Sequence, residues 1–248
     1  MRIDVFFTPA EATPAQLSGR VVAVLDILRA STTVAVALAN GAKAVVPFDS
    51  ADEVIRRAKS FERSEVLLAG ERRMLPIDGF DLGNSPAEFA PDVVEGKTVL
   101  LSTTNGTGAL ASIQGAREVI VASYVNFGPV VALLRTALNG GTDVALLCAG
   151  RERQFSLEDA ACAGRFARHL ARRATNVQLN DAARAAILLD RRYGERVDRL
   201  FADSAHGRAL IEAGFEQDLA TCAALDSHRV IPVYQDRAIT KIGPDRER

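Results

Sequence analysis

The chain has 248 residues, of which 48% are hydrophobic and 25% are charged, and its formal net charge is −1. This length allows one large α/β domain, or two small lobes, around a sizeable core. The nearly balanced charge gives no electrostatic reason to expect nucleic acid or an anionic membrane as a partner. We therefore expect a globular protein with neither of these partners.

The sequence also indicates a cellular location. Asp4 introduces a charge into the N-terminal segment, which lacks the apolar core of a secretory signal. No apolar run approaches the ~20 residues that a membrane-spanning helix requires. The three cysteines, Cys148, Cys162 and Cys222, are odd in number and scattered, which argues against a disulfide framework. We expect a cytoplasmic, reduced protein.

Short apolar runs rich in β-branched residues alternate with helical patterns along the first 148 residues. The predicted strands are Arg20–Leu25, Ala44–Phe48, Glu65–Ala69, Lys97–Ser102, Glu118–Ala122 and Asp143–Cys148. The predicted helices between them are Thr32–Asn40, Ala51–Phe61, Thr107–Gln114 and Pro129–Asn139. This alternation is typical of βαβ units. The sequence therefore predicts an α/β fold with a mainly parallel or mixed sheet flanked by helices.

The character of the chain changes after Cys148, where helical patterns dominate. The helices predicted there are Leu157–Ala174, Leu179–Tyr193, Ser204–Ala213 and Phe215–Leu225. Two further strands are predicted at Val230–Tyr234 and Ala238–Ile242. We expect residues 1–248 to form a single α/β domain whose more helical part begins at about residue 150, with two lobes as the alternative.

Polar segments follow four of the predicted strands. Asp26 to Thr33 follow the first, Gly70 to Arg72 and a loop at 79–88 follow the third, Ser102 to Gly108 follow the fourth, and Ala149 to Glu152 follow the sixth. In open α/β sheets, ligands bind beyond the carboxyl ends of the strands. The sequence therefore predicts a ligand site at this edge of the sheet.

The first strand end has the residues of an anion site. Arg29 is a forked donor suited to a phosphate or sulfonate. Ser31, Thr32 and Thr33 lie where the next helix is predicted to begin, with free N–H groups and the positive end of the helix dipole. A plain Ser/Thr N-cap, worth about 1 kcal/mol, is the alternative interpretation, but it explains only one of the three hydroxyls.

The fourth strand end offers a second anion cradle. It consists of Thr103, Thr104, Asn105, Gly106 and Thr107, and its glycine lets backbone N–H groups approach an oxyanion closely. A capped helix start is the alternative interpretation. Neither a Walker loop nor Gly-x-Gly-x-x-Gly is present, so no motif supports nucleotide binding.

Carboxylates near the same strand ends suggest a divalent metal. Asp26, Glu71, Asp81, Glu158 and Asp159 are oxygen ligands, whereas histidine is scarce and the cysteines are not clustered. Oxygen ligands beside a phosphate cradle favour Mg²⁺ over zinc. Taken singly, each of these acids is more often a solvated charge or a salt-bridge partner.

Two segments resemble catalytic motifs of known phosphatases, but we do not interpret either as such a motif. Cys162 to Arg168 has the spacing of a cysteine phosphatase loop, but it lies in an amphipathic helical pattern that already uses its backbone amides. His206 lacks the arginine that precedes the histidine of a histidine phosphatase. His206 is still a candidate to line the cleft as an acid or hydrogen-bond donor.

Taken in order, these motifs resemble those of the 2-phosphosulfolactate phosphatase family. The motifs are residues 26–33, 70–72, 79–86, 103–107, 158–164, 204–207 and 226–232. The resemblance implies a Mg²⁺-dependent hydrolase of coenzyme M biosynthesis, which converts 2-phosphosulfolactate to sulfolactate and inorganic phosphate. It further implies a small anionic substrate that is phosphorylated and sulfonated, and an architecture particular to that family.

The site hypothesis gives each group a role. The predicted catalytic residues are Asp26, Arg29, Glu71 and His206. The predicted substrate-binding residues are Arg29, Ser31, Thr32, Thr33, Asn84, Ser85, Thr103, Thr104, Asn105, Gly106 and Thr107. Mg²⁺ would be held by some of Asp26, Glu71, Glu158 and Asp159. The attacking group would be either a water positioned by the metal or Asp26 itself.

Two other functions stay open at this point. The chain could be a phosphatase for another small phospho-hydroxy acid, or a non-catalytic binder of a phosphorylated or sulfonated metabolite. Carboxylates repel a bound anion unless a metal intervenes, so their number favours the enzyme. The helical faces after Cys148 could supply a homodimer contact.

Overall fold

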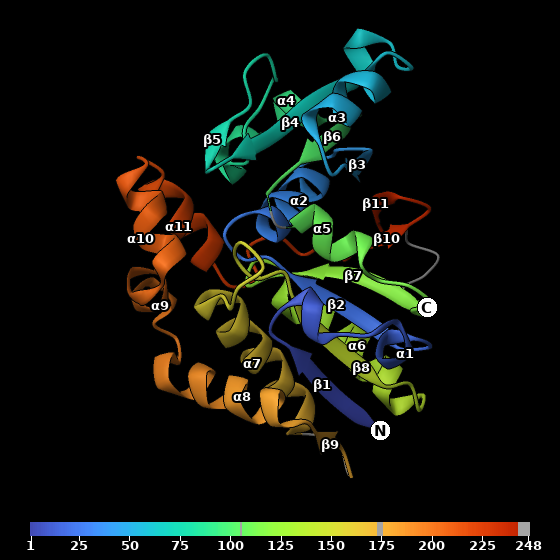
Figure 1. Ribbon diagram of the computed structural model, residues 1–248, viewed down its shortest axis with the longest axis vertical. Helices are drawn as coiled ribbons and strands as arrows, with labels where there is room; N and C mark the ends of the chain where they lie inside the picture. The colour runs from blue at the N-terminus through green and yellow to red at the C-terminus, as the bar shows by residue number, and fades with distance from the viewer. Residues whose placement is uncertain (105, 173–175, 243–248) are drawn as a thin grey trace.

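One mixed sheet runs through the computed structural model, which describes residues 1–104, 106–172 and 176–242 (Figure 1). Its described strands are β1 (Arg2–Phe6), β2 (Val21–Leu25), β3 (Ala44–Pro47), β4 (Val66–Arg72), β5 (Leu75–Pro76), β6 (Thr98–Ser102), β7 (Glu118–Ala122), β8 (Val144–Cys148), β9 (Gln178–Leu179), β10 (Pro232–Gln235) and β11 (Ala238–Lys241). Across the sheet they follow the order β5-β4-β6-β3-β11-β10-β7-β2-β8-β1-β9.

Helices connect most of these strands. The described α-helices are α1 (Pro14–Leu17), α2 (Ala30–Ala39), α3 (Ala51–Ala58), α4 (Pro91–Val94), α5 (Gly106–Ala111), α6 (Phe127–Asn139), α7 (Leu157–Ala171), α8 (Asp181–Tyr193), α9 (Val197–Asp203), α10 (Ala205–Glu212) and α11 (Glu216–Ala223). Short 3₁₀ turns occur at Pro9–Glu11, Arg63–Glu65 and Pro86–Glu88. Within the described segments, no helix has both the length and the apolar composition needed to cross a membrane.

The sheet consists of two parallel groups joined by a hairpin. Strands β7, β2, β8 and β1 are parallel to one another, and so are β3, β6 and β4. The β10–β11 hairpin pairs antiparallel with β7 on one side, at Val233 and Ile120, and with β3 on the other, at Ile239 and Val45. Because three antiparallel pairings lie between β7 and β3, the two groups do not share one strand direction through the hairpin.

Alternate residues of the central strands enter two different hydrophobic cores. In β2, Val21, Ala23 and Leu25 pack into a core that includes α6 and α7, whereas Val22 and Val24 pack into a core that includes α2. This alternation follows from the period of two along a strand. Because both faces are covered, the strands are nearly continuous hydrophobic runs, as expected for a parallel sheet.

The predicted α/β fold is confirmed, including the mixed, mainly parallel sheet and the more helical C-terminal part. All six strands predicted before residue 149 are present, with ends that shift by a few residues. The helix predicted at Leu157–Ala174 ends at Ala171, and residues 173–175 lie outside the described segments. Helix ends fray and depend on capping, so their limits are the weakest part of a sequence-based prediction.

The sequence pattern did not predict strands β1, β5 and β9 or helices α1, α4 and α9. Strand β1 pairs parallel with β8 although it contains Asp4, a charged residue that is only 3% exposed. Arg20 binds the carboxylate of Asp4 at 2.6 Å, which offsets the cost of burying that charge. Helix α9 has only seven residues, too few for its apolar period to be distinguished from the helices on either side.

Helix α7, which begins beside the sheet edge, packs very closely on α8. A Cβ atom at Gly164 of α7 would lie 1.9 Å from the carbonyl oxygen of Ala186 in α8. Only glycine permits this approach of two backbones. The close packing holds the first turn of α7, and the acids in it, in a fixed position relative to the sheet.

Candidate functional site

A small polar pocket lies at the carboxyl ends of β2, β4, β6 and β8. Its volume is about 260 Å³. It is lined by Asp26, Leu28, Arg29, Glu71, Arg73, Met74, Asn84, Thr103, Thr104, Arg151, Glu152 and His206. The pocket therefore occupies the place where the strand-end pattern predicts a ligand site, between the two parallel groups of strands.

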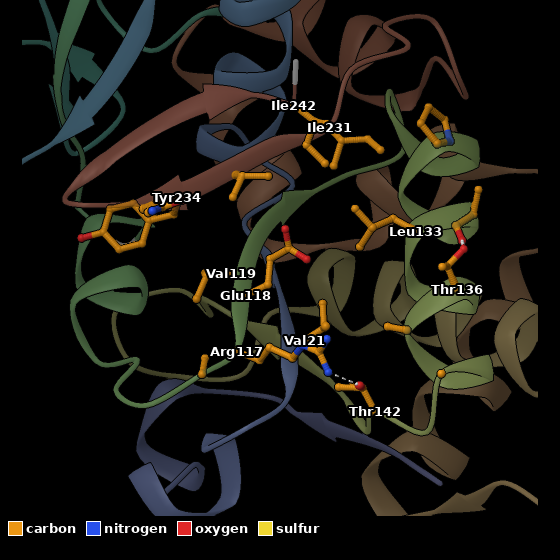
Figure 2. Close-up of a pocket in the computed structure, with 17 residues that line it drawn as sticks. Val21, Arg117, Glu118, Val119, Leu133, Thr136, Thr142, Ile231, Tyr234 and Ile242 are labelled. Carbon is orange, nitrogen blue, oxygen red and sulfur yellow. Dashed lines mark hydrogen bonds between the residues drawn. The ribbon is translucent and has the colours of Figure 1, made fainter. Parts of the chain in front are cut away.

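A larger cavity lies at the opposite ends of the strands. It has a volume of about 1160 Å³ and is formed where β2 and β7 begin, against α6 and β10 (Figure 2). Apolar side chains such as Leu133 and Ile231 line it, and the guanidinium of Arg117 donates to the hydroxyl of Thr142 at 2.9 Å. Within the described part of the chain, no predicted site residue lines this cavity, so the smaller pocket is the candidate site.

Asp26 lies at the bottom of the pocket, directly after β2, and is 6% exposed. Its backbone N–H donates to the hydroxyl of Ser31 at 2.8 Å, which fixes the turn into α2. Burial raises the pKa of Asp26 to about 6; the charges of Glu71 and Glu158 also raise it, whereas His206 and the backbone N–H of Ala30 lower it. The charged form of Asp26 is therefore disfavoured unless a cation is near.

Glu71 lies at the end of β4 and joins three parts of the site. One carboxylate oxygen accepts the backbone N–H of Thr104 at 2.7 Å, and the other accepts that of Met74 at 2.8 Å. Each carboxylate oxygen has a second lone pair, so Glu71 can still bind a cation. The side chain thus holds the ends of β4 and β6 together while it lines the pocket.

His206 enters the pocket from the first turn of α10, whose N-cap is Ser204. Its Nδ1 lies 3.3 Å from a carboxylate oxygen of Glu158, which is 2% exposed and lies in the first turn of α7. Burial raises the pKa of Glu158, but the hydrogen bond and charge of His206, together with hydrogen bonds from the backbone N–H of Glu158 and from Ser156, lower the pKa below its ordinary value. Because Nδ1 is engaged, Nε2 is the ring nitrogen that can serve a bound molecule.

Asp159, the neighbour of Glu158, has both oxygens bonded to backbone amides. Its Oδ1 accepts the N–H of Ile27 at 2.8 Å, and its Oδ2 accepts that of Gly150 at 3.1 Å. Burial, followed by the charges of Glu158 and Asp26, raises the pKa of Asp159 well above its ordinary value. Asp159 is not among the residues that line the pocket, and its contacts tie the end of β2 to the end of β8.

Arg29 lines the pocket but is held by protein groups. Its guanidinium donates to Asp218 at 2.7 Å and to the carbonyl of Met74 at 2.8 Å, and it lies 4.4 Å from the centroid of the Phe215 ring. Ser85 also donates to Asp218, at 2.5 Å. The structure thus brings Arg29 to the predicted site, already neutralised by a buried carboxylate.

The three predicted hydroxyls at the start of α2 all bond to the protein itself. Ser31 accepts the N–H of Asp26, Thr32 donates to the carbonyl of Ile27 at 3.0 Å, and Thr33 donates to the carbonyl of Asn84 at 2.9 Å. None of the three is among the residues that line the pocket. In this structure they shape the turn after β2.

Only some residues of the second predicted anion cradle and of the 79–88 loop line the pocket. Thr103, Thr104 and Asn84 line the pocket, and the buried Oδ1 of Asn84 has no hydrogen-bond partner within residues 1–104, 106–172 and 176–242. A buried polar atom of this kind is usually satisfied by water or a ligand. Asn105 lies outside the described residues, and Gly106 and Thr107 fall in the first turn of α5.

Five lining residues were absent from the predicted site residues: Leu28, Arg73, Met74, Arg151 and Glu152. Arg73 and Met74 form the two-residue turn between β4 and β5, with φ of 51° and 73°, and Glu152 begins a similar turn with φ of 51°. Such turns usually contain Gly, Asn or Asp. Neither turn has that composition, so no turn motif marks these residues, although the strand-end pattern included Arg151 and Glu152 within the segment Ala149 to Glu152.

The donor set fits a magnesium ion bound by two carboxylates. Among the described residues, no group of three or more His, Cys, Asp and Glu side chains is arranged to hold a metal. Asp26 and Glu71 line the pocket, whereas Glu158 and Asp159 lie behind its wall. Mg²⁺ usually keeps several waters and takes one or two carboxylates plus substrate phosphate. Burial is the main cause of the raised pKa of Asp26, and a bound cation would favour the charged form of this carboxyl.

The buried thiol in α7 gives a simple test of the interpretation of the Cys162–Arg168 motif. Cys162 is 0% exposed, and burial raises the pKa of its thiol well above the ordinary value, so it is not a reactive thiolate. We expect Cys162→Ala to leave turnover within about twofold of the wild type, measured as phosphate release. Loss of all activity in a folded variant would mean that the thiol takes part in the reaction.

Comparison with known proteins identifies the family. A family model described as "2-phosphosulpholactate phosphatase" matches residues 6–237. A "Probable 2-phosphosulfolactate phosphatase" of Symbiobacterium thermophilum is 41% identical over 228 residues, which cover 92% of this chain and 95% of the relative. A protein of the same name from Synechococcus sp. is 42% identical over 234 residues, 94% of this chain and 95% of the relative. The chain therefore belongs to the 2-phosphosulfolactate phosphatase family.

Proposed function

We propose that this protein hydrolyses 2-phosphosulfolactate to sulfolactate and inorganic phosphate, with Mg²⁺ as cofactor, in the cytoplasm and as a step of coenzyme M biosynthesis. One observation carries the proposal: Asp26, Glu71 and His206 line one pocket in a chain of the family named for this reaction. The relatives' names, each a probable 2-phosphosulfolactate phosphatase, support the choice of substrate.

The reaction exchanges one P–O bond for another. The oxygen of a water molecule bonds to phosphorus, the ester P–O bond breaks, and one proton of the water ends on the hydroxyl of the product. Phosphoryl transfer passes through a loose transition state, so positioning and charge neutralisation supply most of the rate. The chain's own groups must therefore hold the phosphate in line and deliver a proton to the leaving oxygen.

His206 is placed to deliver that proton. Glu158 binds its Nδ1 at 3.3 Å, which fixes the ring and leaves Nε2 for the leaving oxygen of the ester. After donating, the ring regains a proton as the attacking water is deprotonated, and the histidine is restored. Asp26 and Glu71 would hold Mg²⁺, which supplies neutralisation of phosphoryl charge when it is bound.

The proposal is tested by phosphate release from a panel of phosphorylated small acids, 2-phosphosulfolactate included, with Mg²⁺ and with EDTA. Mg²⁺-dependent release that is fastest with 2-phosphosulfolactate would support the full proposal. Faster release from another phospho-hydroxy acid would keep the phosphatase and overturn the substrate. No release from any member, together with a thermal shift that sulfolactate produces without Mg²⁺, would indicate a non-catalytic binder.

A variant pair tests the proton path. We expect His206→Ala to lower kcat by about 10²-fold or more, because a positioned general acid contributes roughly that factor. Glu158→Gln should lower kcat less, since its amide oxygen can still accept the Nδ1–H of His206. The measurement is kcat for 2-phosphosulfolactate and for p-nitrophenyl phosphate, whose leaving group needs no proton. Equal losses with both substrates would contradict the role as an acid.

A further inference from the structure

Two arginines line the pocket without a role in the chemistry proposed so far. Arg73 lies in the turn after β4, and Arg151 lies just beyond β8. Across residues 1–104, 106–172 and 176–242, neither guanidinium makes a hydrogen bond or ion pair with another described residue. Arg29 and Arg72 differ, because Asp218 holds the first and the hydroxyl of Ser102 accepts from the second at 2.8 Å.

The backbone that carries Arg73 is anchored to the reactive end of the pocket. The next residue, Met74, donates its N–H to Glu71 at 2.8 Å, and its carbonyl accepts from Arg29 at 2.8 Å. Arg151 is fixed in a similar way, since its backbone N–H and carbonyl both bond to Gln154, at 2.9 Å and 2.8 Å. Both guanidinium groups therefore extend from braced turns, which lowers the entropy lost on binding.

Burial separates the pocket into a floor and a mouth. Asp26 and Glu71 are 6% and 8% exposed, whereas Arg73 is exposed and Arg151 is half-buried. A substrate whose phosphate reaches the floor would leave its remaining acidic groups near the mouth. Glu152 also lines the pocket and would repel such groups, so the two arginines must outweigh one carboxylate there.

We infer that Arg73 and Arg151 bind the acidic group, sulfonate or carboxylate, that the substrate carries beside its phosphate ester, and so select it over simple monoesters. The inference rests on the proposed function and specifies how that site recognises its substrate. Planar forked donors suit trigonal carboxylate and tetrahedral sulfonate oxygens equally well. The comparison of substrates in the test therefore decides whether the two arginines bind the sulfonate or the carboxylate.

The test compares Arg73→Gln and Arg151→Gln with Arg153→Gln, a matched control that lies in the same turn region, is exposed and does not line the pocket. The substrates are 2-phosphosulfolactate, 2-phospholactate, which lacks the sulfonate, and p-nitrophenyl phosphate, which lacks both acids. For each variant at the pocket we expect kcat/KM for 2-phosphosulfolactate to fall about 10- to 100-fold, mainly through KM. The value for p-nitrophenyl phosphate should stay within about twofold.

The response to 2-phospholactate assigns the acid. An unchanged kcat/KM assigns the arginines to the sulfonate, and a loss like that for 2-phosphosulfolactate assigns them to the carboxylate. Equal losses with all three substrates, no loss with 2-phosphosulfolactate, or an equal effect of Arg153→Gln would overturn the inference while leaving the phosphatase intact.

A binding measurement separates this inference from the proposed function. If the wild type hydrolyses no phosphate ester, the proposed function fails, and sulfolactate binding can still be measured by calorimetry. Weaker sulfolactate binding in Arg73→Gln and Arg151→Gln, with inorganic phosphate binding unchanged, would support the arginine pair by itself. Unchanged sulfolactate affinity would overturn it.

Discussion

Replacing Asp26 by asparagine is expected to abolish turnover and, at the same time, to make the folded protein more stable at neutral pH. Asparagine has almost the same shape and can still accept the backbone hydrogen bond of Ala30, so the turn after β2 should survive. It cannot carry the negative charge that is needed to hold a cation at the floor of the pocket. We expect kcat to fall by about 10³-fold or more, as for loss of a central charge-stabilising group.

The gain in stability follows from the pKa of the buried carboxyl. Burial raises the pKa of Asp26 from 3.8 to about 6, so the folded state holds this proton more tightly than the unfolded state. The wild type therefore loses stability as the pH rises from about 4 through about 6, where the proton leaves. Asparagine does not titrate, so the variant escapes this loss, which is about 2–3 kcal/mol above pH 7.

The measurement is urea unfolding of both proteins from pH 4 to pH 8, in EDTA so that metal binding does not contribute. The difference in unfolding free energy should be close to zero at pH 4 and grow through pH 6. Asp92→Asn is a suitable control, because Asp92 is exposed in the first turn of α4 and lies away from the pocket. An active Asp26→Asn enzyme, or a difference in stability that does not change with pH, would contradict the assignment.

The sequence predicted where in the fold the site lies better than it predicted which residues form the site. Apolar runs define β2, β4 and β6, and ligands of open α/β sheets bind beyond the carboxyl ends of the strands, so Asp26 and Glu71 were expected at one site. His206 was only a candidate from its motif, since its position depends on the packing of α10. Long-range packing of this kind has no signature in a local pattern.

Some carboxylates near the site line the pocket and others bind backbone amides, and the neighbouring sequence does not show which role each one has. Asp26 and Glu71 line the pocket, whereas Asp159 binds two backbone amides, those of Ile27 and Gly150, from segments far apart in the chain. A carboxylate that satisfies buried amides is a structural brace, and its partners are visible only after folding. The hydroxyls of α2 are similar, because the carbonyl that Thr33 bonds belongs to Asn84.

The most destabilising substitution that we expect near the site is Asp218→Ala. Asp218 lies in α11, is 3% exposed, and binds Arg29 at 2.7 Å and the hydroxyl of Ser85 at 2.5 Å. It thus connects α11, the turn before α2 and the start of the 3₁₀ turn at Pro86–Glu88. Its removal leaves the guanidinium of Arg29 buried without its partner, which costs about 3–5 kcal/mol.

The measurement is urea unfolding at pH 7. Glu216→Ala is the matched control on an exposed position of the same helix, and its unfolding free energy is expected within about 0.5 kcal/mol of the wild type.

The double variant Arg29→Met, Asp218→Leu separates stability from function. Apolar residues of similar volume can replace a buried ion pair with little loss of stability. We expect the double variant to recover most of the stability but little of the turnover, because Arg29 also lines the pocket. Full turnover in that variant would show that Arg29 serves the fold alone, and an unchanged stability of Asp218→Ala would show that the pair does not brace the site.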